Sequence, residues 1–460
     1  MSVVFPEDVF ACNSEKAALI TDEGICSYAE LQRHIAEWQE KLSSTVERPL
    51  VALAMCGNVD SVSCYLACLK SGFPVVLFHP GLSAAGQQAL ITRLTPNLLV
   101  ADNSLTVKHQ RCIPVAGELA LLLTTSGSTG GGKFVALSRE NLAANTASIC
   151  SYLPVTSEDK TLLTMPLSYS YGLSVLNTHL AKGATVRLTS LTPMDRAFWT
   201  LLKDEAVTSL SGVPSFYEML LRLRFDRQLL PELAYFTQAG GKLKEAGVKT
   251  LAEYADKYNK QCFIMYGQTE ATARMAYLDP HTVLRKPSAA GKAIPGGKLS
   301  LCDEHGRLIS EPGITGELLY EGKNVMLGYV SDHTELAVFT PPPVLHTGDL
   351  AFFDEDGDYT ITGRLKRIIK LAGERVNLDG LEALFAEQGL EVKVAGEDNF
   401  LVTACRESEV SKADSCLKSL VSAPPAYLMV RAFSDWPLLG NGKTDYQAIL
   451  KAGRDKHDNG

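Results

Sequence analysis

Residues 121–135 read LLLTTSGSTGGGKFV, and this stretch decides how the rest of the chain is interpreted. The leucines at 121–123 form a short apolar run, which predicts a buried strand. Every residue from Thr124 to Lys133 is Gly, Ser, Thr or Lys. Glycines let backbone N–H groups approach phosphate oxygens, while hydroxyls add donors and the lysine adds a positive charge. We therefore expect a polyphosphate-binding loop after a strand; the alternative is a flexible connection between two elements.

The loop also fits the spacing of a Walker A sequence, G-x-x-x-x-G-K, from Gly127 to Lys133. That motif requires Ser or Thr at the next position, because the hydroxyl there holds Mg²⁺. The residue at that position is Phe134, whose side chain has no atom that can ligate a metal ion. The sequence therefore argues against a P-loop nucleotidase, and another residue must supply the metal ligand.

Length and composition favour a globular chain of two or three domains. The chain has 460 residues, of which 46% are hydrophobic and 21% charged. Its net charge of −8 argues against nucleic acid as a partner, because nucleic-acid-binding proteins usually present basic stripes. Neither a signal peptide nor a membrane span is expected. The 11 cysteines include no C-x-x-C pair, so we expect reduced thiols, a cytoplasmic location and no structural zinc.

Strand-like and helix-like segments alternate along the first part of the chain. Residues 27–44 begin with an N-cap candidate, Ser27, and carry Glu30 three positions later, followed by apolar residues at helical spacing. Further helices are expected at 59–72 and 138–153, and strands at 49–55, 74–78 and 97–102. Such alternation predicts an α/β fold with a parallel sheet covered on both faces.

Four later strands run into turns that are rich in Gly, Pro, hydroxyl and aromatic residues. The segments concerned are 161–186, 207–214, 234–243 and 261–275. In open α/β sheets, ligands bind just beyond the carboxyl ends of the strands, so a nucleotide and a substrate could meet at these turns. Tyr169 and Tyr171 lie in the first of them, where aromatic packing beside a helix start is the alternative interpretation.

From about residue 290 the pattern changes to short alternating runs with many Gly turns, which predicts antiparallel strands in a small barrel or meander. Asp356-Gly357 is a hairpin signal within this region. A different unit of short strands and helices follows, so we expect a domain boundary at 363–366.

Six short motifs in order resemble those of the adenylate-forming superfamily, which includes acyl-CoA synthetases, peptide-synthetase adenylation domains and luciferases. The matching blocks are the glycine loop, the Y-G-x-T-E block at 266–270, G-E-L at 316–318 with G-Y at 328–329, T-G-D at 347–349, G-R-x-K-x-x-I-K-x-x-G at 363–373, and G-K at 442–443 after Pro437. Each block alone is a weak signal, but their number and order are specific. The resemblance runs from about residue 20 to residue 450.

The resemblance implies an AMP-forming ligase that uses ATP and Mg²⁺. A carboxylic acid would be activated as an acyl-adenylate with release of pyrophosphate, and then transferred to the thiol of CoA or of carrier-protein phosphopantetheine. The implied fold is α/β: residues 1–363 form a large N-terminal domain of two stacked αβ layers plus a small β-barrel, with the β-rich part at about 290–363. Residues 364–460 form a small mobile α+β C-terminal domain.

Carried over motif by motif, the resemblance also implies residue roles. The catalytic residues would be Lys443, Thr269 and Glu270, with Glu270 as the Mg²⁺ ligand. The nucleotide would be held by Thr125, Ser126, Gly127, Ser128, Thr129, Gly130, Lys133, Gly240, Gly241, Tyr266, Gly267, Gln268, Asp349 and Arg364. The acyl pocket would include Tyr169, Ser170, Gly172 and Gln238, and the hinge and thiol tunnel Lys366, Lys370 and Gly373.

Four of these residues have ordinary alternatives when each is taken alone. Glu270 could be a solvated charge at a helix start, where the helix dipole favours it. Asp349 could stabilise a turn, Lys443 could be a surface lysine, and Lys366 could be an exposed linker charge.

The sequence also departs from the family's pattern. Gly132 stands where Pro is usual and Phe134 where Gly is frequent, while Tyr169 stands where many acyl-CoA synthetases have a gating His or aromatic residue, so an aromatic wall of the acyl pocket is still expected. Relatives that activate amino acids place an Asp within the segment that matches 170–172, and this chain has no carboxylate there. An α-ammonium group would lack its counter-charge, so a non-amino carboxylic acid is the expected substrate.

Three other functions stay open. The protein could load only a carrier protein, which the short C-terminal region favours, or bind an adenylate without turnover. A P-loop nucleotidase, which would release γ-phosphate without any acid, is disfavoured by Phe134.

Overall fold

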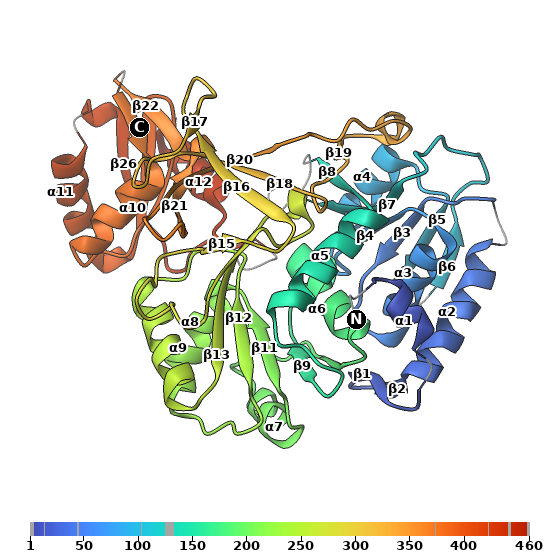
Figure 1. Ribbon diagram of the computed structural model, residues 1–460. Coiled ribbons are helices and arrows are strands. Elements are labelled where there is room, and N and C mark those ends of the chain that lie inside the picture. Colours follow the sequence, from blue (N-terminus) through green and yellow to red (C-terminus); the bar gives the residue numbers. More distant parts are fainter. Residues whose placement is uncertain are drawn as a thin grey trace. The chain divides into compact units, whose positions relative to one another are not determined.

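The computed structural model describes residues 4–12, 14–43, 46–102, 104–124, 133–372, 374–421, 423–439 and 443–457. The chain divides into two compact units, Met1–Leu299 with Tyr320–Leu345, and Ser300–Leu319 with His346–Gly460 (Figure 1). The expected boundary at 363–366 lies within the second unit. The assignment of separate domains at 1–363 and 364–460 therefore stays a prediction.

The first unit contains a seven-stranded sheet in the order β19-β8-β7-β4-β3-β5-β6. Its strands are β3 (Val51–Ala54), β4 (Val75–Phe78), β5 (Leu98–Ala101), β6 (Ser104–Val107), β7 (Leu119–Thr124), β8 (Phe134–Ser138) and β19 (Gly328–Val330). Strands β5, β3, β4 and β7 pair in parallel, and β3 and β4 are buried along their whole length. The apolar runs that predicted these strands are therefore confirmed as the interior of a parallel sheet.

A nine-stranded sheet in the same unit has the order β15-β14-β13-β12-β11-β9-β10-β1-β2. Its strands are β1 (Ala17–Thr21), β2 (Gly24–Ser27), β9 (Lys160–Leu163), β10 (Thr185–Leu188), β11 (Ser209–Gly212), β12 (Tyr235–Gln238), β13 (Gln261–Tyr266), β14 (Ala276–Leu278) and β15 (Lys292–Ala293). From β1 to β13 the neighbouring pairs are parallel. The carboxyl ends of β9, β11, β12 and β13 consequently lie along one edge of the sheet.

Helices connect the strands of both sheets (Figure 1). They are α1 (Glu7–Ala11), α2 (Tyr28–Ser43), α3 (Val59–Ser71), α4 (Ala84–Leu94), α5 (Arg139–Tyr152), α6 (Ser170–Ala181), α7 (Arg196–Asp204), α8 (Pro214–Arg222) and α9 (Glu245–Lys257). The expected cap of α2 is confirmed: the Glu30 N–H donates to Ser27 Oγ at 3.2 Å, and the Ser27 N–H donates to Glu30 Oε2 at 2.9 Å. Every residue of helix α6 is buried, so this helix is covered by neighbouring elements on all sides.

The second unit combines antiparallel strands with a small α+β region. A five-stranded sheet in the order β17-β16-β18-β20-β21 contributes most of its residues here. Its strands are β16 (Gly297–Cys302), β17 (Leu308–Ile309), β18 (Gly316–Gly322), β20 (Leu345–Phe353) and β21 (Tyr359–Arg364). The β20–β21 hairpin confirms the turn expected at Asp356-Gly357. The antiparallel prediction is thus confirmed for the described registers, while closure into a barrel stays a prediction.

The C-terminal part of this unit has its own core. It comprises β22 (Ile368–Leu371), β23 (Glu374–Asn377), α10 (Leu378–Glu387), β24 (Lys393–Glu397), β25 (Phe400–Cys405), α11 (Val410–Leu420), β26 (Leu428–Ala432) and α12 (Tyr446–His457). Phe385 of α10 and Leu417 of α11 are fully buried against strand residues such as Val394. This arrangement confirms the expected α+β character of the region.

Two global expectations can be compared with the structure. All 11 cysteines are free thiols. Within the described ranges, no helix has both the length and the apolar character needed to cross a membrane.

Candidate functional site

The carboxyl-edge turns of the nine-stranded sheet bring together residues that are far apart in the sequence. Ser170 Oγ, at the start of α6, lies 3.1 Å from Thr269 Oγ1, which follows β13. Gln238 Nε2, at the end of β12, donates to the Gly241 carbonyl at 2.9 Å. A Cβ at Gly240 would lie 2.6 Å from the Tyr169 hydroxyl, so these two turns are in contact. Residues assigned separately to the acyl pocket and to the nucleotide thus share one location.

The Y-G-Q-T-E turn is closed by its own backbone. The Ala271 and Ala273 N–H groups both donate to the Gln268 carbonyl at 3.1 Å, and the Met275 N–H donates to the Tyr266 carbonyl at 2.9 Å. Gly267 is packed so closely that a Cβ there would lie 1.8 Å from the Ala273 carbonyl oxygen. Only glycine fits this position without moving the turn that carries Thr269 and Glu270.

Replacing Gly267 with alanine should therefore displace the turn. Relieving a backbone clash of this kind costs on the order of 1–3 kcal/mol, so any activity that depends on Thr269 and Glu270 should fall at least about 10-fold. A matched control is Gly117→Ala, where no atom lies within 4 Å of the added Cβ. Unfolding temperature and activity of both variants would be measured; equal activities would contradict the prediction.

Glu270 lies in a small polar cluster of the first unit. The Tyr329 hydroxyl donates to Glu270 Oε1 at 2.9 Å, and Lys133 Nζ lies 5.5 Å from the centre of the Tyr329 ring. Burial, together with the Glu270 charge, raises the pKa of Tyr329, so this hydroxyl remains a donor. Glu270 Oε2 accepts no hydrogen bond from the described residues, which leaves a hard carboxylate oxygen suited to Mg²⁺.

Most of the glycine loop lies outside the described residues, including Thr125, Ser126, Gly127, Ser128, Thr129 and Gly130. Its flanks are nevertheless informative. Thr124 pairs with Phe134 in an antiparallel ladder, so the loop joins two strands, whereas a Walker A loop leads from a strand into a helix. Phe134 is 3% exposed, and the Arg93 guanidinium lies 4.9 Å from its ring centre. Phe134 is therefore a core residue, and the argument against a P-loop is strengthened.

In the second unit, Asp349 and Arg364 face each other across the β20–β21 hairpin. Arg364 Nε lies 2.8 Å from Asp349 Oδ1, and the Asp349 side chain is 2% exposed. The Asp349 N–H donates to Thr347 Oγ1 at 3.0 Å, and that hydroxyl donates to the Leu318 carbonyl at 2.7 Å. The structure thus pairs two residues that the motifs assigned separately to the ribose.

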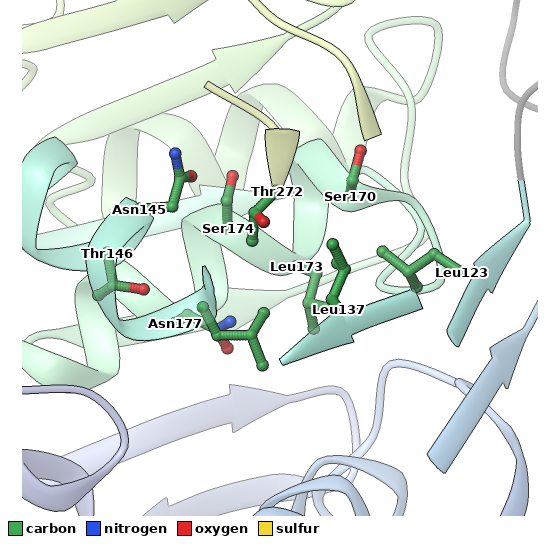
Figure 2. Close-up of a pocket in the computed structure, with 10 residues that line it drawn as sticks. Leu123, Leu137, Asn145, Thr146, Ser170, Leu173, Ser174, Asn177 and Thr272 are labelled. Atoms are coloured by element: carbon green, nitrogen blue, oxygen red, sulfur yellow. The ribbon is translucent and has the colours of Figure 1, made fainter. Parts of the chain in front are cut away.

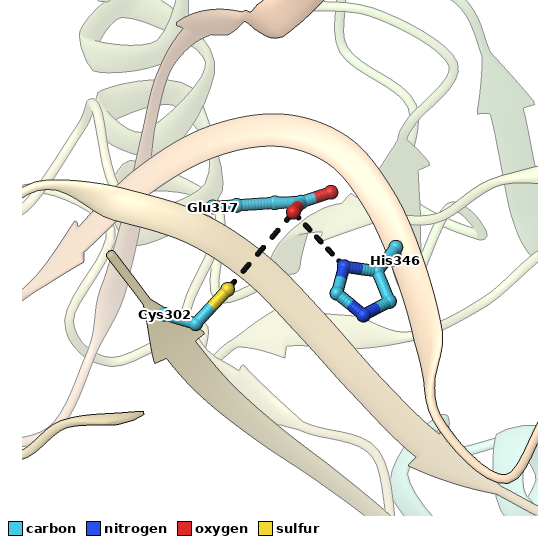
Figure 3. Close-up of side chains that lie close together, drawn as sticks. All are labelled: Cys302, Glu317 and His346. Atoms are coloured by element: carbon cyan, nitrogen blue, oxygen red, sulfur yellow. Dashed lines mark hydrogen bonds and ion pairs between the residues drawn. The ribbon is translucent and has the colours of Figure 1, made fainter. Parts of the chain in front are cut away.

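Glu317 stabilises the same turn and also contacts His346 and Cys302, and the last two contacts are drawn in Figure 3. Its Oε1 accepts from the Gly348 N–H at 3.2 Å, and its Oε2 lies 2.9 Å from His346 Nδ1 and 3.9 Å from Cys302 Sγ. Burial, with the nearby Glu317 carboxylate, raises the pKa of the Cys302 thiol, which favours its neutral form. The three side chains are close enough to share a metal ion, but the hydrogen bonds to Glu317 already account for the cluster.

A second group of possible metal ligands has a similar explanation. Asp354, Asp356 and Asp358 lie together in the hairpin turn. Asp354 Oδ1 accepts from the Asp356 and Asp358 N–H groups, each at 3.0 Å. This is an ordinary turn arrangement.

The remaining C-terminal residues are described only in part. The Leu439 N–H donates to the Lys443 carbonyl at 2.8 Å, and the Asp445 N–H donates to the Pro437 carbonyl at 2.7 Å, so the backbone at Lys443 pairs with the segment that ends at Leu439. Lys366 and Lys370 are exposed. Gly442 and Gly373 lie outside the described residues. The roles given to these residues stay predictions.

The sequence analysis missed Arg274. This residue is 1% exposed, its Nη1 donates to Ser174 Oγ at 2.8 Å, and its guanidinium carbon lies 4.0 Å from the centre of the Tyr171 ring. A signal existed: Arg274 is the single charge in the run A-T-A-R-M-A-Y that follows Glu270. Charged residues are rarely buried without a function or a partner.

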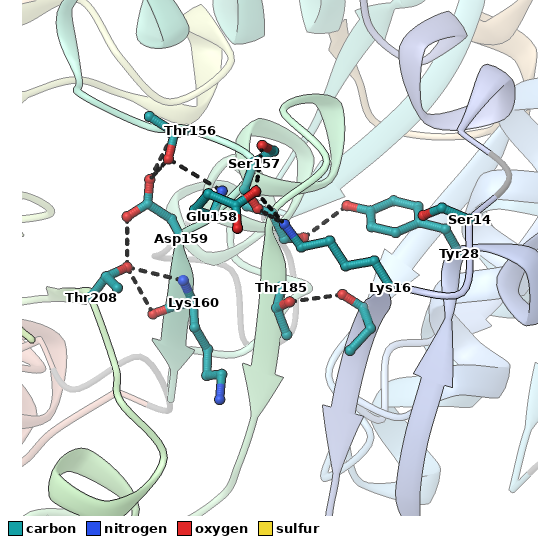
Figure 4. Close-up of polar contacts among 12 residues, drawn as sticks. Ser14, Lys16, Tyr28, Thr156, Ser157, Glu158, Asp159, Lys160, Thr185 and Thr208 are labelled. Carbon is teal, nitrogen blue, oxygen red and sulfur yellow. Dashed lines mark hydrogen bonds and ion pairs between the residues drawn. The ribbon is translucent and has the colours of Figure 1, made fainter.

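The acidic residues nearest to Ser170 in sequence are occupied elsewhere. Asp159 precedes β9 and so lies at the amino end of that strand, where its Oδ1 accepts from Thr208 Oγ1 at 2.6 Å and its Oδ2 from the Thr156 N–H at 2.6 Å (Figure 4). Asp195 accepts from the Thr192 N–H at 2.8 Å. Both carboxylates thus accept hydrogen bonds from nearby threonines, and the exclusion of an α-ammonium group stays a prediction.

Comparison with known proteins identifies relatives of this chain. A family model described as "AMP-binding enzyme" matches residues 101–330. The D-alanine–D-alanyl carrier protein ligase of Bacillus licheniformis is 27% identical, with 94% of this chain and 95% of the relative covered. The 2-succinylbenzoate–CoA ligase of Bacillus pumilus is 26% identical, with 83% and 82% covered.

Solved structures share the fold. An ATP-bound RpMatB-BxBclM chimera superposes with a TM-score of 0.79 at 20% identity, covering 98% of this chain and 99% of its own. The O-succinylbenzoate coenzyme A synthetase of Bacillus subtilis, in complex with ATP and magnesium, superposes with a TM-score of 0.77 at 21% identity, covering 95% and 97%. The expected α/β fold of adenylate-forming enzymes is thereby confirmed.

Proposed function

The chain belongs to the AMP-binding enzyme family, and on that premise we propose that it is an ATP-dependent, AMP-forming acid–thiol ligase. A carboxylate is a poor electrophile, because loss of hydroxide or oxide from it is unfavourable. Attack of a carboxylate oxygen on the α-phosphorus of ATP forms an acyl-adenylate and breaks the bond to the β-phosphate, so pyrophosphate leaves. Such a step depends on positioning and on charge stabilisation.

The contact between Ser170 and Thr269 carries this proposal. In the proposed site, Thr269 contacts the α-phosphate and Ser170 borders the acyl pocket, and the reaction requires these two groups to be adjacent; their hydroxyl oxygens lie 3.1 Å apart. Glu270 would hold Mg²⁺, which would offset the charge of the phosphates. Lys133 and the loop before it would bind the departing pyrophosphate, with Tyr266, Gly240 and Gly241 beside the adenine. Asp349 and Arg364 would bind the ribose.

We further propose that one C-terminal region serves two half-reactions in turn. Lys443 would stabilise charge during adenylate formation. Residues 364–460 would then reorient about Lys366, and the segment from Lys370 to Gly373 would border the path of the thiol. Attack by that thiol on the acyl carbon yields the thioester and releases AMP. This scheme is domain-scale gating.

Two features bear on the substrates. The segment 170–172 has no carboxylate that could pair with an α-ammonium group, which supports a non-amino acid as substrate. The similar ligases named above include one for a carrier protein and one for CoA, so both acceptors are proposed.

Carboxylate-dependent exchange of labelled pyrophosphate into ATP tests the proposed function across a panel of acids. Exchange with at least one acid is expected. No exchange with any acid would overturn the proposal in favour of adenylate binding without turnover, and phosphate release without acid would favour a nucleotidase. Thioester formation with CoA or with a phosphopantetheinylated carrier protein then identifies the acceptor.

A further inference from the structure

The segment between the G-E-L and G-Y motifs packs against the turn that carries Thr269 and Glu270. The Met326 N–H donates to the Glu270 carbonyl at 2.9 Å. The Thr272 hydroxyl donates to the Asn324 carbonyl at 2.7 Å. The backbone of this segment and the backbone of the turn are therefore fixed to each other.

The Asn324 side chain joins two carbonyls of the same turn. It is 3% exposed, and its Nδ2 donates to the Ala271 carbonyl at 2.7 Å and to the Arg274 carbonyl at 2.9 Å. Its Oδ1 accepts from the Tyr320 hydroxyl at 2.8 Å. Burial raises the pKa of Tyr320 to about 12, so this hydroxyl keeps its proton at neutral pH and fixes which way the amide faces. One buried amide thus holds the backbone on both sides of Thr272.

The same segment is also attached to the strand that follows the glycine loop. The Leu327 N–H donates to the Ala136 carbonyl at 2.8 Å, and β19 then pairs with β8 as far as Phe134. Phe134 lies opposite Thr124, where the glycine loop begins. Residues 324–330 therefore connect the turn of the proposed Mg²⁺ ligand with the strand of the proposed phosphate loop.

The turn that Asn324 holds also borders the proposed acyl pocket. Thr272 and Ser170 line one small cavity of about 10 Å³ (Figure 2), and Ser170 Oγ lies 3.1 Å from Thr269 Oγ1. A shift of this turn would therefore change the spacing between the groups proposed for the acid, the α-phosphate and the metal.

We infer that Asn324 is a positioning residue of the proposed reaction: by holding the backbone at 271–274, it fixes the Glu270 carboxylate relative to the strand that follows the glycine loop. This inference rests on the part of the proposed function in which Glu270 binds Mg²⁺ beside ATP. Asparagine suits the role, because its amide offers two donors and an acceptor and can bind two carbonyls and a hydroxyl at once. Removing a group that orients a metal ligand typically costs about 10- to 100-fold in metal affinity or activity.

Asn324→Ala should weaken the contribution of Mg²⁺ to ATP binding. The dissociation constant of ATP would be measured by calorimetry with excess Mg²⁺ and with a chelator, and the ratio of the two values gives that contribution. The ratio should fall about 10-fold in the variant, because the turn no longer holds Glu270 in place. Equal ratios in wild type and variant would overturn the inference, and so would a wild type whose affinity for ATP does not depend on Mg²⁺.

Pyrophosphate exchange gives a second measurement. We expect kcat to fall about 10- to 100-fold in Asn324→Ala, since displacing a positioned group by about 1 Å can cost roughly 100-fold in rate. The Mg²⁺ concentration at half-maximal exchange should rise about 10-fold. A lower kcat with an unchanged Mg²⁺ requirement would contradict a role that acts through Glu270.

Asn97 offers a matched control, because its side chain is also buried and also joins backbone groups. Its Oδ1 accepts from the Leu50 N–H at 3.0 Å, and its Nδ2 donates to the Arg111 carbonyl at 2.8 Å. Asn97→Ala should lower the unfolding temperature but leave the Mg²⁺ dependence of ATP binding and of exchange unchanged. If it altered them as much as Asn324→Ala does, the effect of Asn324 would be one of general stability and the inference would be wrong.

Should Asn324→Ala fail to fold, Tyr320→Phe still tests the inference. This change removes only the hydroxyl that orients the Asn324 amide and keeps the ring in the core. The Mg²⁺ contribution to ATP binding should fall about fivefold, as for the loss of one neutral hydrogen bond. An unchanged contribution would overturn the inference.

The outcomes distinguish this inference from the proposed function. If no acid supports exchange while Asn324→Ala still reduces the effect of Mg²⁺ on ATP binding, the ligase proposal fails and the positioning role stands. If exchange occurs and Asn324→Ala lowers only the unfolding temperature, the positioning role is wrong and the ligase proposal stands.

Discussion

Lys443→Ala should lower carboxylate-dependent pyrophosphate exchange by at least about 100-fold, because one preorganised charge aimed at a developing negative charge contributes about 10²–10³ in rate. The lysine would act where the carboxylate oxygen bonds to the α-phosphate, and alanine leaves that charge unmatched. The backbone on both sides of Lys443 is held by hydrogen bonds from the Leu439 and Asp445 N–H groups, which do not involve its side chain, so the substitution should leave the fold intact. Exchange of labelled pyrophosphate into ATP measures the effect directly.

The second half-reaction should respond differently to the same substitution. Thioester formation from a supplied acyl-adenylate should be nearly unchanged in Lys443→Ala, because Lys443 would act only in the first step. Lys451→Ala is the matched control: this lysine is exposed on α12 of the same unit. Equal losses in both half-reactions would contradict the scheme in which one region serves two steps.

Glu270→Gln should have an effect of similar size. The amide keeps the shape of the side chain and can still accept from Tyr329, but it removes the negative charge that a hard cation requires. We expect pyrophosphate exchange to fall about 100-fold at a fixed Mg²⁺ concentration, which is the typical effect of removing one charged group that stabilises the transition state. Part of this loss should be recovered at high Mg²⁺ concentration. A titration of exchange activity against Mg²⁺ measures both changes.

Tyr329→Phe separates the charge of Glu270 from its orientation. It removes the hydrogen bond at 2.9 Å but keeps the aromatic ring beside Lys133. Losing one such bond should cost about 1 kcal/mol, or roughly fivefold in exchange, with no change in the Mg²⁺ requirement. If Glu270→Gln were no worse than Tyr329→Phe, Glu270 would not be the metal ligand.

Much of the fold could be predicted from the sequence, because the features concerned depend on residues that lie close together along the chain. Ser27 and Glu30 form the cap that their spacing indicated, since both partners lie within one helical turn. The apolar runs became β3 and β4, because a strand covered on both faces must be apolar throughout. Phe134 argues against a metal-binding P-loop by residue type alone, because its side chain has no atom that can ligate Mg²⁺.

Other features depend on residues that no local pattern connects. The contact between Ser170 and Thr269 joins residues 99 positions apart, and it exists because parallel strands align their carboxyl ends. The pairing of Asp349 with Arg364 required the register of a hairpin with a bulge between Leu350 and Ala351. Because register sets which side chains face each other, motif order alone could not predict this ion pair.

The sequence alone determined the class of chemistry, because phosphate loops, carboxylates and turn glycines are recognisable by residue type and order. Whether a given charged side chain is buried, and whether it has a partner of opposite charge, was decided by the tertiary structure. Arg274 is the single charge in an otherwise uncharged run of the sequence, and only the fold buries it beside the Ser174 hydroxyl and the Tyr171 ring. The physical reason is that the free energy of a charge depends on the groups and the solvent around it, which only the folded chain defines.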